Sequence, residues 1–289
     1  FEITKTTEGT YTQTQYVKGT IDGTANGGIN NEPVGEACRF AGLTAKGSLL
    51  FAACIKEDGF LNLGAEVISL FQVNTALNHE LIKTAYMTDS NFIQKDSEQA
   101  FDPNWFMANG MAVDNDGNLY ITNSKASLAP NKDAISQITI TQNGSSSFLD
   151  FSHKTWISGS EFFPNGLQIE GDTLYYAGGS DIIKAKIQSD LTASETRVHF
   201  DGADLAIIDD FAIQDGYIAY AKVSAPGAVI VLKPADFNSN ARYYFTIPMP
   251  VIPSSIIYQP NIPNGNQLFN EGNLLITSFF NGGLFRVEF

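Results

Sequence analysis

A short phrase recurs along the chain and limits the folds that it can adopt. It consists of a small or polar pair, an alternating apolar strand, a turn with Gly or Asp, and a second apolar strand. Clear copies read NGMAVDNDGNLYITNS at 109–124, NGLQIEGDTLYYA at 165–177 and DDFAIQDGYIAYA at 209–221, and weaker copies lie at 41–54 and 254–279. The copies that begin at 109, 165, 209 and 254 are 56, 44 and 45 residues apart. A spacing in this range is typical of four-stranded units repeated around an axis, which is the architecture of a β-propeller.

The rest of the chain fits the same plan. Its segments are short, alternate between apolar and polar residues, and are separated by Gly, Asn and Asp, and no sustained helical periodicity is present, so the sequence predicts an all-β fold. Counting the segments gives a single propeller domain over 1–289 with five blades of four strands. The last blade, with strands at 254–258, 273–279 and 283–288, is one strand short. The segment 11–18 (YTQTQYVK) is predicted to supply that strand, with 1–35 forming the closing strand and its loop.

Charge excludes some partners. The chain has 17 Lys and Arg against 31 Asp and Glu, a net charge of −14 at pH 7, and no basic cluster, so nucleic acid is not an expected partner. No stretch approaches the roughly 20 apolar residues of a membrane span. The negative charge attracts cations, and its simpler effect is to keep the protein soluble.

Two features favour secretion. Cys38 and Cys54 are the only cysteines, and a hairpin with strands at 40–45 and 49–54 brings them near enough for a disulfide. The alternative is two free buried thiols. Asn143 begins an Asn-Gly-Ser glycosylation sequon in a polar turn. Disulfides and N-glycans both belong to the secretory route, so we expect a secreted or extracellular protein.

The first residues of three copies carry oxygen donors. Asn109, Asn165 and Asp209 share one phase of the repeat and are expected at one mouth of the central channel, with Asp210 beside them. Calcium takes six to eight oxygen ligands of this kind, whereas zinc would require His and Cys. The alternative is that these side chains cap the strand entries by bonding nearby backbone. A second acidic string, DNDGN at 114–118, lacks the closing Glu of an EF-hand loop and predicts a hairpin turn.

The strings NGM at 109–111, PNGL at 164–167 and DDF at 209–211 resemble the repeat starts of the calcium-dependent propeller hydrolases. That superfamily includes the paraoxonases, the gluconolactonase and senescence-marker-protein family and, more distantly, the strictosidine synthases. The resemblance covers roughly 100–235. It implies six blades, a catalytic calcium ion in the channel, and hydrolysis of lactones or esters.

The same resemblance implies ligand roles. It carries the calcium ligands over to Asn109, Asn165 and Asp209, and the paraoxonase pattern adds Asp210. The chain departs from the pattern at Ala41, where those families place a Glu. The strictosidine synthase branch implies that the scaffold also supports chemistry without the metal.

Loops predicted at the same mouth supply candidates for the remaining roles. His153, in a loop expected at 152–164, is a candidate general base, with Asp102 and Glu161 as competitors for that role. Aromatic residues next to the two Asn positions would line a pocket for an apolar substrate or fill the gaps between blades; these are Trp105, Phe106, Phe162 and Phe163.

The sequence therefore predicts a secreted calcium-dependent hydrolase of small lactones or esters, acting on an apolar small molecule. Ala41 and the aromatic residues favour an alternative, a propeller enzyme that does not hydrolyse its substrate, such as an isomerase, cyclase or condensing enzyme. A third interpretation is a non-catalytic secreted propeller that binds a partner through its loops.

Overall fold

The structure is a computed structural model of the whole chain. It describes residues 2–5, 11–14, 39–46, 49–56, 66–74, 80–86, 107–124, 133–142, 149–158, 163–188, 193–198, 207–223, 226–233, 242–258, 273–278 and 283–287. The chain forms two compact units, Phe1–Ser160 and Glu161–Phe289, and each is described by itself. The expectation of a single domain over 1–289 stays a prediction.

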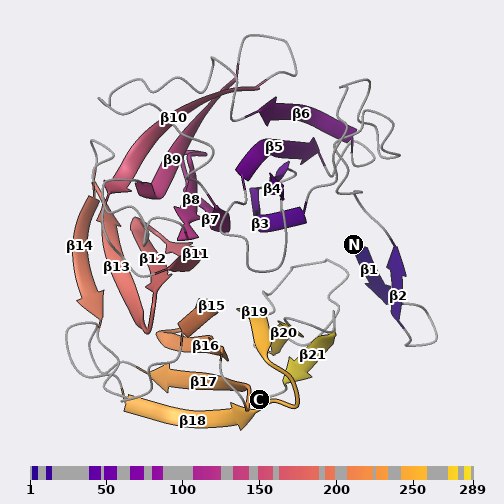
Figure 1. Cartoon of the computed structure of the whole chain (residues 1–289), viewed down its shortest axis with the longest axis vertical. Coiled ribbons are helices and arrows are strands. Elements are labelled where there is room, and N and C mark those ends of the chain that lie inside the picture. The colour runs from indigo at the N-terminus through magenta and orange to yellow at the C-terminus, as the bar shows by residue number, and fades with distance from the viewer. Residues whose placement is uncertain are drawn as a thin grey trace. The chain divides into compact units, whose positions relative to one another are not determined.

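The first unit contains three antiparallel sheets (Figure 1). A two-stranded sheet pairs β1 (Glu2–Lys5) with β2 (Tyr11–Thr14). The first four-stranded sheet comprises β3 (Arg39–Lys46), β4 (Leu49–Lys56), β5 (Glu66–Asn74) and β6 (Glu80–Tyr86). The second comprises β7 (Ala108–Val113), β8 (Leu119–Asn123), β9 (Asp133–Gln142) and β10 (Leu149–Ser158).

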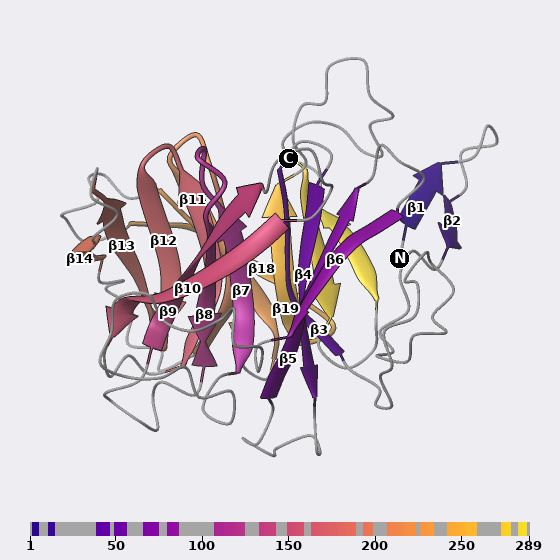
Figure 2. The ribbon, with the colours of Figure 1, turned by 90° about the horizontal axis from the view of Figure 1, so that it is seen from above.

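The second unit also contains three antiparallel sheets. One comprises β11 (Pro164–Glu170), β12 (Thr173–Gly178), β13 (Asp181–Ile187) and β14 (Ala193–Val198), and its first three strands lie side by side in Figure 2. The next comprises β15 (Ile207–Gln214), β16 (Tyr217–Val223), β17 (Ala228–Lys233) and β18 (Arg242–Pro248). The last has three strands, β19 (Pro253–Tyr258), β20 (Leu274–Ser278) and β21 (Leu284–Val287).

The sheets confirm the predicted strand plan. Within each one, every strand pairs with the next along the chain, and the described residues contain no α-helix. The turns follow from the sequence, since Asp215 and Gly216 at the β15–β16 turn both have positive φ, of 52° and 76°, as a two-residue hairpin turn requires. No helix long and apolar enough to cross a membrane occurs in the part of the chain that the structure describes.

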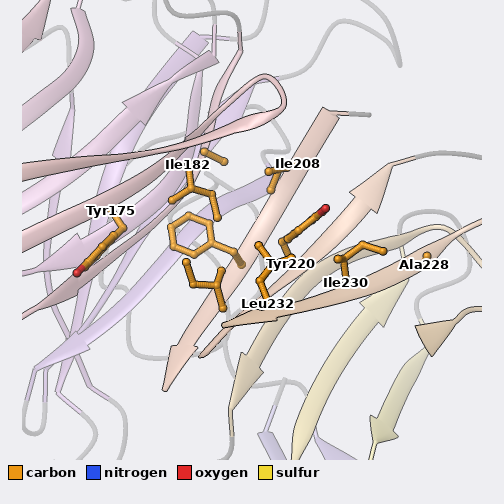
Figure 3. Packing of buried hydrophobic residues seen from close by; sticks show 10 residues of the cluster. Tyr175, Ile182, Ile208, Tyr220, Ala228, Ile230 and Leu232 are labelled. Atoms are coloured by element: carbon orange, nitrogen blue, oxygen red, sulfur yellow. The ribbon is translucent and has the colours of Figure 1, made fainter. Parts of the chain in front are cut away.

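The core of the second unit lies between successive sheets. In Figure 3, Ile182 and Tyr175 from the β11–β14 sheet gather with Ile208, Tyr220 and other residues from the β15–β18 sheet. A second cluster joins the β15–β18 sheet to the β19–β21 sheet, with Ile256 2% exposed. Burial of each large aliphatic side chain stabilises the fold by roughly 1.5–3 kcal/mol. Packing of one sheet on the next brings the first strands together, so that β15 contacts both β11 and β19.

A β-bulge interrupts the first strand of five sheets at the same point. Two residues of that strand oppose a single residue of the next strand, and the five bulged pairs are Ala41-Gly42, Asn109-Gly110, Asn165-Gly166, Asp209-Asp210 and Ser254-Ser255. These pairs begin at the repeat starts found in the sequence. A bulge bends the strand and changes the direction in which its side chains point. The repeated sequence phrase is therefore also a repeated backbone feature.

The first unit bears on the predicted closing strand, on the predicted pairing of the two cysteines and on the disulfide. Of the closing strand predicted at 11–18, the described part, β2, pairs with β1 in a hairpin. Cys54 pairs with Phe40 rather than with Cys38, because the bulge at 41–42 shifts the register of the hairpin. Cys38 lies outside the described residues, so the disulfide stays a prediction, as do blade count and closure.

Candidate functional site

Asn165 and Asp209 come together although they are 44 residues apart in the chain. The amide Nδ2 of Asn165, in the β11 bulge, donates to Oδ1 of Asp209, in the β15 bulge, at 2.7 Å. Asn165 is buried, at 7% exposure. Burial raises the pKa of Asp209, and hydrogen bonds from the Ser254 and Asn165 side chains act in the opposite direction. The described groups that act on this carboxyl therefore include two neutral donors and no cation.

Asp210 uses its carboxylate differently from its neighbour. Its Oδ2 accepts from Ser255 Oγ at 2.6 Å and from Ile256 N at 3.3 Å, and its Oδ1 accepts from Phe211 N at 2.9 Å. Burial is the largest influence on this carboxyl and raises its pKa to about 6. The Asp210 side chain therefore joins β15 to β19, and its oxygens bind donors within the fold.

Close packing of β11 on β15 depends on Gly166. A Cβ at this position would lie 2.3 Å from Asp210 Oδ1 and 2.7 Å from Asp210 Cα, well inside ordinary contact. Gln168 adds a second connection, since its Nε2 donates to Phe211 O at 2.7 Å and its Oε1 accepts from Ile213 N at 3.0 Å. β15 is an edge strand of the β15–β18 sheet. The Gln168 amide therefore binds main-chain groups on the side of β15 that faces away from β16.

The bulge of β7, in the first unit, is held by its own sheet. Asn109 Nδ2 donates to Ser124 Oγ at 3.2 Å, and Thr122 Oγ1 accepts from Gly110 N at 2.8 Å. Asn109 is partly exposed, whereas Ser124 and Thr122 are buried. This arrangement agrees with the local capping alternative for Asn109, and its assignment as a calcium ligand stays a prediction.

Ala41 holds the first bulge position of β3. The register places Ala41-Gly42 opposite Ala53, as it places Asn165-Gly166 opposite Ala177. Ala41, which has no ligating side chain, therefore lies at the position in β3 that is equivalent to Asn165 in β11. A Cβ on Gly42 would lie 2.5 Å from Asn109 O, so here too a glycine in the bulge allows the next first strand to approach.

The acidic turn at 114–118 is confirmed as a hairpin turn. Asp114 N donates to Asn118 O at 3.0 Å, and Gly117 has a φ of 94°. The buried Asp114 carboxylate accepts from Asn118 N at 2.8 Å and from the Tyr120 hydroxyl at 3.2 Å. The Lys46 ammonium donates to the main-chain oxygens of Asp114 and Asn115. The ammonium group of Lys46 is therefore a cationic partner of this turn.

The prediction of a loop at 152–164 is wrong for residues 152–158. Strand β10 continues to Ser158, and His153 pairs in register with Ile138 within that strand. The strand extends because β9 is long enough to pair with all of it, with bulges after Thr155. His153 therefore lies in a strand rather than in a loop.

Most of the other predicted site residues lie outside the described residues. These are Asp102, Glu161, Trp105, Phe106, Phe162 and the sequon residue Asn143, and their roles stay predictions. Phe163 is described and is half-buried, with a φ of 48° directly before Pro164. A positive φ before proline is disfavoured, so the entry to β11 is a strained turn next to Asn165.

Among the described residues, no group of three or more His, Cys, Asp or Glu side chains gathers that could hold a metal ion. The pair of Asn165 and Asp209 offers an amide and a carboxylate instead, which are ligand types suited to a hard cation. Sequence reasoning missed Ser254 as a partner of Asp209, Ser255 as a partner of Asp210, and Gln168 as a partner of the β15 main chain. The repeat phase could have found the two serines, since Ser254 follows Asp209 by 45 residues.

Comparison with known proteins assigns no family. No protein-family model matches the chain, and no curated protein matches it either. Among solved structures of propeller proteins, virginiamycin B lyase from Staphylococcus aureus aligns over 86% of this chain and 69% of its own, at 12% identity and a TM-score of 0.47. A gluconolactonase from Xanthomonas campestris aligns over 80% of this chain and 65% of its own, at 14% identity and a TM-score of 0.44. Similarity at this level transfers no activity to the chain.

Proposed function

We propose that the sheets are blades of a β-propeller and that the chain is a secreted, calcium-dependent hydrolase of small lactones or esters. The observation that carries the proposal is the contact between Asn165 and Asp209 at 2.7 Å. Two oxygen-bearing side chains, from equivalent bulges of adjacent first strands, meet in a largely buried position. No apolar packing role explains this choice of residues.

The donor chemistry fits a calcium ion. Burial raises the pKa of Asp209 and so disfavours its ionised form, and the groups that act on it among the described residues include no cation. A divalent cation would supply an opposite charge to this partly buried carboxylate. Asn165 and Asp209 would hold the ion, with water completing the set.

A calcium ion held by these residues would supply Lewis-acid polarisation of a substrate carbonyl and stabilisation of negative charge on its oxygen. The chain's own contribution is to fix the ligands. Asn165 donates to Asp209, and Gln168 binds β15 main-chain groups on either side of Ala212. These bonds hold the Asp209 side chain and the two strands in place before any ligand arrives.

Calcium titration tests the proposal. The protein, freed of metal with a chelator, is titrated with calcium in a calorimeter and assayed on a panel of lactones and aryl esters with and without chelator. We expect saturable binding in the wild type, a loss of affinity of at least 10-fold in Asp209→Asn, and turnover that requires calcium. Asp172→Asn is the matched control, because Asp172 is an exposed carboxylate paired with Lys186 at 3.2 Å, away from the bulges. Equal affinity in Asp209→Asn and the wild type would contradict the proposal.

A specific observation favours a second candidate. Ala41 occupies the bulge position at which the resembling hydrolases carry a Glu, so one expected carboxylate is absent there. A propeller enzyme that acts on an apolar small molecule without a metal, as an isomerase, cyclase or condensing enzyme, fits this residue. Turnover that persists unchanged in chelator, with folded protein, would support this candidate over the hydrolase.

A further inference from the structure

We infer that Ser254 belongs to the calcium site, as the residue that orients the Asp209 carboxylate. The inference rests on the proposed function, since it concerns the same site. Ser254 is not among the ligands that the resemblance implies, and it is not one of the two proposed ligands, Asn165 and Asp209. Its role is positioning: it acts on the ion through Asp209.

The first argument is position. Ser254 is the first residue of the bulged pair Ser254-Ser255 in β19, as Asp209 is in β15 and Asn165 in β11. The three residues therefore occupy equivalent places on three strands that pack in the order β11, β15, β19. Equivalent backbone geometry gives their side chains equivalent starting directions.

The second argument is bonding. The Ser254 hydroxyl donates to the Asp209 carboxylate, and Asn165 donates to Asp209 Oδ1 at 2.7 Å. Asp209 is thus held by one donor from the strand before it and one from the strand after it. Donors of this kind stabilise the ionised carboxylate, which is the form that binds a cation. Groups that hold metal ligands in this way typically contribute 10- to 100-fold to metal affinity.

The third argument is the contrast between the two adjacent serines. Ser255 Oγ donates to Asp210 Oδ2 at 2.6 Å, and Ser255 N donates to Thr277 Oγ1 at 3.0 Å. Both bonds join β19 to β15, but Ser254 binds the proposed ligand Asp209 and Ser255 binds Asp210. The bulge separates two residues of the same type into different roles, which provides a matched pair for experiment.

Calorimetric calcium titration of Ser254→Ala, Ser254→Thr and Ser255→Ala tests the inference, with a thermal melt of each variant. We expect Ser254→Ala to bind calcium about 10-fold more weakly, and Ser254→Thr, which keeps the hydroxyl, to bind within about twofold of the wild type. Ser255→Ala should lower the melting temperature and leave the affinity within about twofold, because its bond goes to Asp210 and not to Asp209.

The outcomes separate this inference from the proposed function. If the wild type binds calcium and Ser254→Ala binds equally well, the role of Ser254 is refuted and the site of Asn165 and Asp209 stands. If both serine variants weaken binding to the same extent, Ser254 acts only through the stability of the fold, and the inference is again refuted. If the wild type binds no calcium, the proposed function fails and the inference fails with it.

Discussion

Replacing Gly166 by Ala should damage the site and the fold together. The added Cβ would lie 2.7 Å from Asp210 Cα, where ordinary contact begins at 3.4 Å, so β11 and β15 must separate locally by about 0.7 Å. Such overpacking against backbone typically costs about 1–3 kcal/mol. The same separation would lengthen the hydrogen bond of 2.7 Å between Asn165 and Asp209 beyond its normal range.

Two measurements check this expectation. A loss of 1 kcal/mol lowers the melting temperature of a domain of 150–250 residues by roughly 2–4 °C, so we expect a fall on the order of 5 °C in thermal melts followed by circular dichroism. Calcium affinity, measured by calorimetry well below the melting temperature, should fall by about 10-fold because the two ligands no longer meet in the native geometry.

Gly171→Ala in the same hairpin provides the control. Gly171 has a φ of 64°, and a Cβ added there would have nothing within 4 Å of it, so alanine strains the turn without touching β15. We expect a loss of about 1 kcal/mol from the left-handed backbone and no change in calcium affinity. Unchanged stability and affinity in Gly166→Ala would refute the argument that this glycine sets the approach of the two strands.

Three further predictions concern other parts of the structure. Thr122→Val should lower the free energy of unfolding by about 1–3 kcal/mol in chemical denaturation, because it leaves Gly110 N without its acceptor at 2.8 Å, and Thr122→Ser should restore most of the loss. Tyr120→Phe removes a buried hydroxyl that bonds Asp114 Oδ2 at 3.2 Å, and should cost about 1–2 kcal/mol by the same measurement; an unchanged denaturation midpoint would contradict the bond. The pKa of Asp210 is raised from 3.8 to about 6, so its proton stabilises the folded state below pH 4 and that contribution, about 3 kcal/mol, is lost as the pH rises through 6. In chelator, melts from pH 4 to 7 should therefore show a larger fall in melting temperature for the wild type than for Asp210→Asn, and equal falls would refute the shift.

The strand plan could be predicted because local sequence determines it. Alternating apolar residues and Gly or Asp turns define both strands of a hairpin such as 207–223, whose structure needs no distant partner to be recognised. The second half of β10 escapes prediction because His153, Lys154 and Thr155 have the composition of a polar loop. Those residues form a strand because β9 offers them main-chain partners, and that pairing is a tertiary effect.

The sequence predicted which residues lie at the candidate site but not which hydrogen bonds they form. The repeat phase identifies Asn165 and Asp209 as equivalent residues, and the structure brings them together. The repeat phase could not reveal that Asp210 bonds to β19, because the bulge that redirects adjacent side chains is a property of strand register. The role of Asp210 as a calcium ligand stays a prediction. Calcium binding and hydrolysis stay predictions that the experiments above address, and secretion stays a prediction.

The shared bulge gives evolution a simple means of changing chemistry on this scaffold. Because the main chain takes the same two-against-one path at 41, 109, 165, 209 and 254, each of these positions accepts a new side chain without a new backbone. The chain now carries Ala, Asn, Asn, Asp and Ser there. Single substitutions at five such positions would convert one donor set into another, so related chains of this kind can diverge in activity while their strands remain in register.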